Sequence, residues 1–306
     1  MLFRSDCSQE DASHNIIGAT KLSRGCLPTI DRKIFDRMNQ QIDVERIARN
    51  GAWYVARARL NSMSKWKGII TFVAIGNPLF YLVAIGIGIG VLVTQNSGTA
   101  GTGGVKYILF IAPALLANTA LLGAMDEAVF PVLEGFKWRK LFYATNATPI
   151  TGHQISTGVF LAALARTAYS VLIYWILLVL FGVVTWDSWI APVVSMYGGA
   201  AFGAVMMAVV AGIKSDDYFL TVLGRLVITP LFLFSGTFFP LSSMPIYLQP
   251  IGWISPLWHT TELGRYFTYD HSIAPLMLFI HFVFLTALLV VGLKVSSRRF
   301  TSRLLK

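Results

Sequence analysis

The stretch Ser272-Ile-Ala-Pro-Leu-Met-Leu-Phe-Ile-His-Phe-Val-Phe-Leu-Thr-Ala-Leu-Leu-Val-Val-Gly-Leu293 contains no Asp, Glu, Lys or Arg. An α-helix needs about 20 mostly apolar residues to cross the hydrocarbon core of a membrane. A strand of a membrane β-barrel would be shorter and would alternate in polarity, which this stretch does not do. The stretch therefore predicts a transmembrane helix.

Similar apolar stretches occur elsewhere and predict five more spans, at residues 68–93, 107–125, 155–186, 188–213 and 218–239. The composition agrees, because 55% of the residues are hydrophobic and only 13% are charged. A soluble domain carries about 25% charged residues. We therefore predict an all-α, polytopic membrane protein with six transmembrane helices.

The positive charge indicates how the helices are oriented. An even number of spans places both termini on one side, and cytoplasmic loops are rich in Lys and Arg. With the termini in the cytoplasm, 21 of the 25 Lys and Arg residues lie on the cytoplasmic side. The net charge of +10 thus fits anionic lipid headgroups and membrane topology better than nucleic acid.

The first 43 residues are polar and mixed in charge, and they predict a poorly ordered cytoplasmic segment ahead of a membrane domain at 44–306. Met38 is an alternative start. Cys7 and Cys26 lie in this segment without a His or Cys cluster around them, so we expect free thiols and no metal site.

Residues 44–63 have apolar side chains at three- and four-residue steps, which is typical of an amphipathic helix. Arg46, Arg49 and Arg57 occupy the other face, and Trp53 lies at the border. We expect a helix lying in the cytoplasmic interface of the membrane. The alternative is a soluble helix packed on a partner protein.

The connection between the second and third predicted spans is basic and aromatic, and it predicts a short amphipathic helix that Pro149 ends. Such a helix can anchor in headgroups or dock into a groove of a cytosolic partner. Its candidate docking residues are Glu134, Lys137, Trp138, Arg139, Lys140, Leu141, Phe142 and Tyr143.

Two arginines lie within predicted spans, Arg166 in the third and Arg225 in the fifth. They can extend toward the cytoplasmic interface, or they can face the bundle and attract an anionic substrate headgroup. We favour the first reading for Arg225 and leave both open for Arg166. The nearest acids, Asp126 and Glu127, are expected to end the second span on the cytoplasmic side, which argues against a proton- or sodium-coupled transporter.

The segment between spans five and six is too apolar for a solvated loop, and four prolines exclude one straight span. Short helices that re-enter the outer leaflet satisfy both facts, provided that protein or a water-filled cavity covers their backbone. The pattern in this segment is Ser-Gly-Thr-Phe-Phe-Pro240, Met-Pro245, Ser-Pro-Leu-Trp-His259 and then Arg265.

These residues resemble the C-terminal signature of ABC type-2 exporter permeases, in particular the nodulation-signal and daunorubicin-type drug exporters. The run Lys140-Leu-Phe-Tyr-Ala-Thr with Pro149 resembles the segment before that family's third span. The likeness covers residues 44–306.

The resemblance implies a permease that exports an amphipathic drug, lipid or glycolipid across the bacterial plasma (inner) membrane. ATP and magnesium would bind a separate ATPase subunit, since this sequence has no phosphate-binding loop of the Gly-Lys-Ser/Thr type. The permease would pair with a second copy or a related permease, and residues 134–148 would form the coupling helix. An outer gate would include Gly236, Phe239, Pro240, Pro245, Pro256, His259 and Arg265.

Two other classes of function compete with this reading. A membrane acyl- or glycosyltransferase would need a polar catalytic cluster, for which the candidates are Asp126, Glu127 and His153, or His259, Glu262 and Asp270. Neither group includes a nucleophile or a metal-binding spacing. A gated channel would need a filter or a ring of charge, which no span provides.

Overall fold

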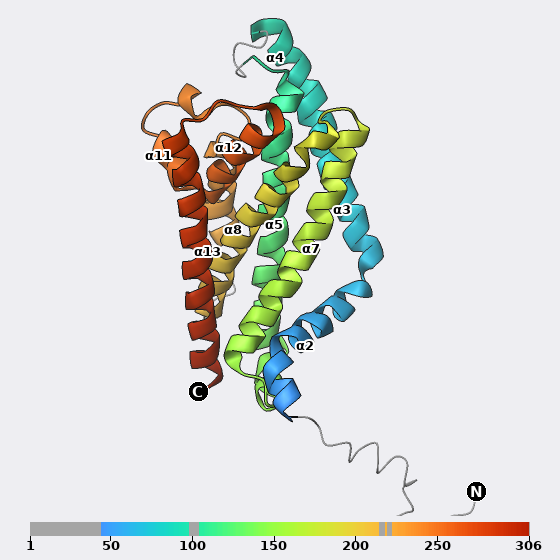
Figure 1. Cartoon of the computed structure of the whole chain (residues 1–306), viewed down its shortest axis with the longest axis vertical. Helices are drawn as coiled ribbons and strands as arrows, with labels where there is room; N and C mark the ends of the chain where they lie inside the picture. Colours follow the sequence, from blue (N-terminus) through green and yellow to red (C-terminus); the bar gives the residue numbers. More distant parts are fainter. Residues whose placement is uncertain (1–43, 98–103, 214–217, 219–221, 306) are drawn as a thin grey trace, which may run out of the picture. The chain divides into compact units, whose positions relative to one another are not determined.

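The computed structural model describes residues 44–97, 104–213, 218 and 222–305, and every regular element in these ranges is a helix (Figure 1). The predicted N-terminal segment, with Cys7 and Cys26, lies outside the described residues.

Five stretches in this part of the chain are helical, long and apolar enough to cross a membrane. The first, Lys67–Val93, consists of α3 (Lys67–Tyr81), the π-helical η1 (Leu82–Ile89) and the start of α4 (Gly90–Ser97). The others are α5 (Tyr107–Leu133) with the π-helical η3 (Glu134–Trp138), α7 (Gly152–Leu180), the 3-10 turn η4 (Trp186–Trp189) with α8 (Ile190–Ala211), and α13 (Pro275–Leu304). The prediction of an all-helical protein with several membrane helices is thereby confirmed.

The fifth predicted span, 218–239, is described only in part. The π-helical η5 (Leu223–Ile228) and α10 (Thr229–Phe234) form a shorter apolar helix, and residues 219–221 lie outside the described ranges. The arrangement of six spans therefore stays a prediction.

The helix that contains Asp126 and Glu127 does not end there, contrary to the expectation from the sequence. It continues as an α-helix to Leu133 and as a π-helix to Trp138. Glu127 lies 20 residues after Tyr107, about 30 Å along the axis, which equals the thickness of a hydrocarbon core. The acidic residues thus do not end the helix, and we expect them at the depth where it leaves the apolar region of a membrane.

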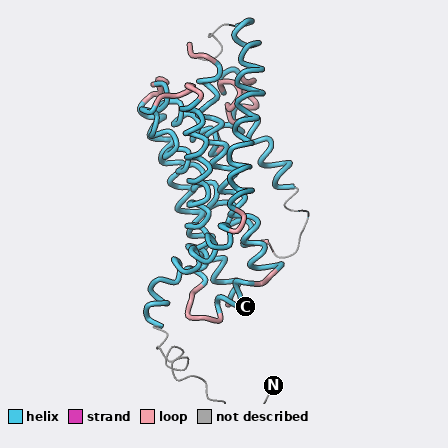
Figure 2. The backbone as a smooth tube through the Cα atoms, turned by 90° about the vertical axis from the view of Figure 1, so that its right-hand side faces the viewer, coloured by secondary structure: helices cyan, strands magenta, loops and turns pink. Residues whose placement is uncertain are grey.

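The centre of the helical unit is the contact between α5 and α8, most of whose residues are buried. Small side chains permit this contact, since a Cβ atom at Gly199 would lie 2.7 Å from the Ala120 carbonyl oxygen. Gly or Ala at such positions lets two membrane helices approach closely. Helices α7, α12 and α13, labelled in Figure 1, pack around this pair, and Figure 2 shows the long helices running side by side.

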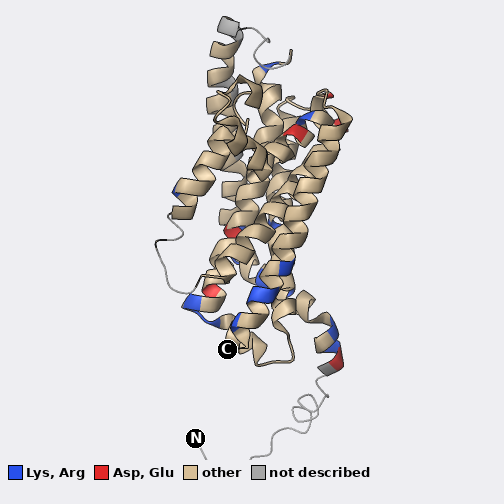
Figure 3. Cartoon of the chain, turned by 90° about the vertical axis from the view of Figure 1, so that its left-hand side faces the viewer, with Lys and Arg blue, Asp and Glu red and all other residues tan. Residues whose placement is uncertain are grey.

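One end of this unit is rich in Lys and Arg (Figure 3). We call it the charged end, and it consists of α2 (Val44–Ser64), η3, α6 (Leu141–Asn146), the start of α7 and the end of α13. Helix α2 covers the predicted amphipathic stretch 44–63, although its place at a membrane interface stays a prediction.

The opposite end carries the proline-rich segment. Its elements are the 3-10 turn η6 (Leu241–Ser243), α11 (Gln249–Ile254) and α12 (Pro256–Tyr269). The expectation of short, broken helices agrees with these elements, and their depth in a membrane stays a prediction.

Candidate functional site

A network of ion pairs crosses the charged end. Its centre is Glu127 of α5, which is only 4% exposed. One carboxylate oxygen forms an ion pair with Arg166 of α7, and the other lies 3.4 Å from the guanidinium of Arg59 on α2. Three helices far apart in the sequence are thus joined at one buried carboxylate.

The network extends to the segment that follows α5. Arg59 also donates to Glu134 of η3 at 3.3 Å, and Glu134 accepts from Arg139 at 3.2 Å. Arg59 therefore holds α2 against both α5 and η3. Since a buried charge is costly unless it is paired, the contacts with Arg59 and Arg166 compensate for the burial of the Glu127 carboxyl group.

Arg166 is accounted for by this network. The sequence left open whether it extends toward the interface or attracts an anionic substrate, and the structure pairs it with Glu127. Arg225 lies in η5 and is exposed. The two arginines thus have different surroundings.

The predicted amphipathic helix after the second span is divided in two. Lys140 has left-handed backbone angles, with φ of 53°, and separates η3 from α6. Because of this break, the chain folds back and the ring of Phe142 lies against Gly135, where an added Cβ atom would be 2.2 Å from the ring. The segment is a compact helical corner and not one straight helix.

The side chains of this corner have two distinct environments. Phe142 is buried with Phe136 and Phe300, whose ring centroids lie 4.8–5.4 Å apart. Trp138, Leu141 and Tyr143 are 55%, 49% and 40% exposed. The exposed set offers an aromatic surface to a partner, whereas Phe142 belongs to the core that holds the corner in place.

Helix α2 is also tightly packed on the start of α7. A Cβ atom at Gly158 would lie 2.6 Å from the Ala52 carbonyl oxygen, so the two backbones touch. Gln154 completes the capping box of α7 with Thr151 and donates to the Ala48 carbonyl. A movement of α2 is therefore passed to α7 through backbone contact as well as through charge.

Arg265 organises the opposite end. It is 1% exposed, donates to the Gly236 carbonyl at 2.8 Å and to Glu262 at 2.8 Å, and lies 3.8 Å from the centre of the Phe110 ring. Gly236 has a φ of +67°, which favours glycine. The arginine thus ties the chain after α10 to α5 and α12.

His259 lies close by in a second buried group. Its Nε2 is 2.9 Å from the Trp253 carbonyl and its Nδ1 is 2.7 Å from Nδ1 of His281. A carbonyl only accepts, so Nε2 of His259 carries the proton and His281 donates to the other nitrogen. Burial lowers the pKa of His259 to about 4, so the ring is neutral at pH 7.

The remaining residues of the predicted outer signature lie along the same segment. Phe239 is 41% exposed, Pro240 precedes η6, Pro245 follows it, and Pro256 begins α12. The structure brings Gly236 and Arg265 into contact, and it does not place these four residues in that contact.

The sequence did not lead us to predict Arg59 as a functional residue. A signal existed, because Arg59 follows Val55 by four residues and therefore lies on the apolar stripe of its helix. An arginine on the apolar face of a helix is expected to pair with an acidic residue, and the sequence contains only 15 Asp and Glu residues that could be its partner.

Comparison with known proteins gives consistent matches. The family model of the ABC-2 type transporter matches residues 52–269. Nodulation protein J of Rhizobium leguminosarum bv. viciae is 28% identical over 268 residues, which are 86% of this chain and 99% of that protein. Nodulation protein J of Rhizobium meliloti (strain 1021) is 27% identical over 227 residues, 72% of this chain and 83% of that protein. No solved structure matches the chain.

Proposed function

This chain belongs to the ABC-2 type transporter family as the permease subunit of an exporter, and we propose that its charged end couples the permease to ATP hydrolysis. The membrane domain of this family has no ATPase site, and membership implies an ABC ATPase partner. ATP and magnesium would be bound by that partner.

The double contact of Arg59 carries the proposal. Arg59 is bonded to Glu127 in the membrane helix α5 and to Glu134 in the corner that follows it. The corner presents Trp138, Leu141 and Tyr143 on its surface, in a form suited to a groove of the ATPase. Closure of the ATPase subunits would displace the corner, and Arg59 would carry α2 along with it.

Helix α2 leads directly to the first membrane helix, since α2 ends at Ser64 and α3 begins at Lys67. The Trp66 and Ile70 amides bond to carbonyls of the preceding turn, so the joint between the two helices is short and hydrogen-bonded. A displacement of α2 would tilt α3. In this scheme the signature residues around Arg265 hold the opposite end closed until the helices tilt.

The resemblance and the charge distribution support the wider assignment. The Lys and Arg residues of the charged end favour a cytoplasmic location for both termini, in the bacterial inner membrane. We propose six spans, a substrate that is an amphipathic drug, lipid or glycolipid, and a pair of permeases. Exposed apolar side chains on α3 and η5, such as Phe72 at 76% and Leu226 at 70%, suit a contact with lipid or with the second permease.

The proposed function predicts that a neighbouring gene encodes an ABC ATPase, and the test is co-expression of this chain with that ATPase. The two proteins should co-purify, and reconstitution in liposomes should raise ATP hydrolysis above that of the ATPase alone. Arg59→Gln should leave co-purification intact and reduce this stimulation, whereas Arg57→Gln on the exposed face of the same helix should not. An ATPase that neither binds the permease nor responds to it would refute the proposal.

A further inference from the structure

The last turns of α13 are enclosed by other helices of the charged end. Phe300 is 0% exposed, and a Cβ atom at Gly152 in α7 would lie 2.8 Å from the Cα atom of Thr301. Higher on the same helix, a Cβ atom at Gly292 would lie 2.7 Å from the carbonyl carbon of Ala204, so the backbones of α13 and α8 touch. The end of α13 is therefore an internal part of the helical unit and is packed tightly on α8.

Two arginines of α13 bind the C-terminal end of α8. Arg299 donates to the Ala208 carbonyl at 2.7 Å. One nitrogen of Arg303 donates to the carbonyls of Ala211 and Ile213, at 3.1 and 2.8 Å. The last carbonyls of a helix have no partner within it and carry partial negative charge, so basic side chains are favourable there. These bonds fix the position of the Arg303 guanidinium.

The same guanidinium also contacts the helical corner. Its Cζ atom lies 4.4 Å from the centre of the Phe136 ring, which belongs to η3 and is 3% exposed. A cation over the face of an aromatic ring is attracted by the π electrons, and the attraction is stronger where water is excluded. Arg303 thus joins the end of α8 to the corner, through a nitrogen on one side and its planar face on the other.

The contact of the corner with α13 differs in kind from its contact with α2. Arg59 joins α2 to the corner by an ion pair. The corner rests on α13 through the ring of Phe300 and the guanidinium of Arg303, and the Asn146 amide lies 3.5 Å from the Leu304 carbonyl, which is long for a hydrogen bond. Packed helices can slide by small steps over such contacts. A displaced corner is therefore expected to stay with α2 and to separate from Arg303.

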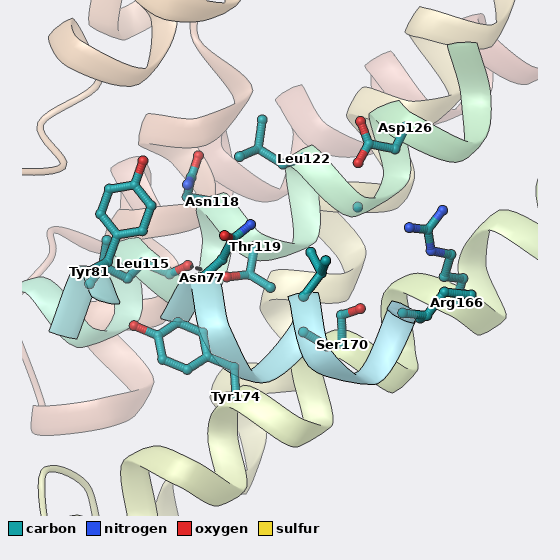
Figure 4. A pocket seen from close by; sticks show the side chains of 14 residues that line it. Asn77, Tyr81, Leu115, Asn118, Thr119, Leu122, Asp126, Arg166, Ser170 and Tyr174 are labelled. Carbon is teal, nitrogen blue, oxygen red and sulfur yellow. Dashed lines mark hydrogen bonds between the residues drawn. The ribbon is translucent and has the colours of Figure 1, made fainter. Parts of the chain in front are cut away.

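The first membrane helix offers little resistance to this displacement. A cavity of about 90 Å³ lies between α3, α5 and α7, and Figure 4 shows side chains of all three helices around it. Large apolar side chains on α3, among them Ile69, Phe72 and Phe80, are exposed. The resting position of α2 and the corner therefore depends on contacts at the corner itself.

We infer that Arg303 is a positioning residue, which holds the helical corner against the end of α8 and thereby keeps the exposed surface of the corner in its resting position. Displacement of the corner by the ATPase breaks the contact with Phe136, while the bonds from Arg303 to α8 remain. This inference rests on the proposed function for the view that the ATPase displaces the corner. The contact itself lies within the permease and can be measured without the ATPase.

The first test is a double-mutant cycle on the purified permease, unfolded with sodium dodecyl sulfate in mixed micelles. Phe136→Leu removes the ring and keeps an apolar side chain, and Arg303→Gln removes the charge and keeps a donor for the α8 carbonyls. The double variant should raise the equilibrium constant of unfolding about fivefold less than the product of the two single effects, as expected for one buried cation–π contact. Arg299→Gln combined with Phe136→Leu is the control and should show no such coupling. Independent effects of Arg303→Gln and Phe136→Leu would overturn the inference.

The second test is the ATP dependence of hydrolysis by the reconstituted complex. Arg303→Gln and Phe136→Leu should each lower the KM for ATP about fivefold, because closure of the ATPase no longer has to break this contact, and kcat should stay within about twofold. Arg303→Lys keeps the charge and should lower the KM less. Arg299→Gln loses a bond to α8 of the same kind and should leave the KM unchanged.

The split between KM and kcat distinguishes positioning from damage, since a poorly folded complex loses kcat. An unchanged KM in Arg303→Gln, or an equal fall of the KM in Arg299→Gln, would overturn the inference. If Phe136→Leu does not assemble with the ATPase, Arg303→Gln and Arg303→Lys decide the outcome.

These measurements separate the inference from the proposed function. Normal stimulation of the ATPase by the wild-type permease, with an unchanged KM in Arg303→Gln, would refute the role of Arg303 and leave the proposed function standing. A permease that shows the coupling in the cycle but neither binds nor stimulates the ATPase would refute the proposed function, and with it the role of Arg303 in positioning a docking surface.

Discussion

Replacing Glu127 by Gln tests whether this carboxylate holds the charged end together. Gln has the same size, so no void is created, but the negative charge is lost. The Glu127 side chain is 5% exposed, and its partners Arg59 and Arg166 are 26% and 24% exposed. Removing one partner of a fully buried pair costs about 3–5 kcal/mol. Because both arginine side chains are partly exposed and can be hydrated once the carboxylate is gone, we expect the free energy of unfolding to fall by about 2–3 kcal/mol.

The comparison with Glu134→Gln makes the prediction sharper. Glu134 is 25% exposed and its partner Arg139 is 72% exposed. Ion pairs so accessible to water contribute about 0.2–1 kcal/mol. The substitution at Glu127 should therefore cost at least about twice as much as the one at Glu134.

The assay is the free energy of unfolding of the purified permease, titrated with sodium dodecyl sulfate in mixed micelles and followed by circular dichroism. Glu45→Gln, an exposed carboxylate in the first turn of α2, is the control and should cost about 0.5 kcal/mol or less. If Glu127→Gln costs no more than the control, Glu127 does not hold the three helices and the reasoning fails.

Three further predictions concern single side chains. Phe142→Ala should lower the free energy of unfolding by about 3–4 kcal/mol because the ring fills the buried corner, whereas Trp138→Ala should leave it within about 0.5 kcal/mol and reduce co-purification with the ATPase. Arg265→Met should cost about 3 kcal/mol in the same titration, since it strands the Gly236 carbonyl and removes a buried charge pair, and an unchanged value would contradict the contacts described above. The free energy of unfolding should fall by up to about 3 kcal/mol as the pH drops from 6.5 toward 4, because His259 takes up its proton at a higher pH in the unfolded chain than in the folded one. His259→Asn should reduce this dependence of the free energy of unfolding on pH.

The helices were predictable because lipid as a solvent imposes long, uncharged stretches. Helices α3, α8 and α13 begin within three residues of the predicted positions. The amphipathic helix α2 was predictable for a related reason, since its apolar side chains repeat with the helical period. Local pattern thus determines which segments are helical.

The pairing of charges was not predictable in the same way. The partners of Glu127 lie 39 and 68 residues away in the sequence, so nothing near Glu127 indicates that its charge is neutralised. Because these distant partners are not visible in the local sequence, the acidic residues Asp126 and Glu127 were interpreted as the end of the helix, and α5 was expected to stop at residue 125. The break at Lys140 was not predicted, because nothing in the sequence marks a lysine that adopts left-handed backbone angles. The one related feature in the sequence is Gly135, whose missing side chain leaves room for the ring of Phe142.

We propose that α2 and the helical corner at η3 and α6 move as one body when ATP is hydrolysed. The most direct measurement is the distance between spin labels at Arg57→Cys and Ala147→Cys, in the reconstituted complex with its ATPase and with Cys7 and Cys26 replaced by Ser. We expect this distance to stay the same when ATP and magnesium are added, while either label moves relative to a third at the end of α13. A distance between α2 and α6 that changes with nucleotide would contradict it.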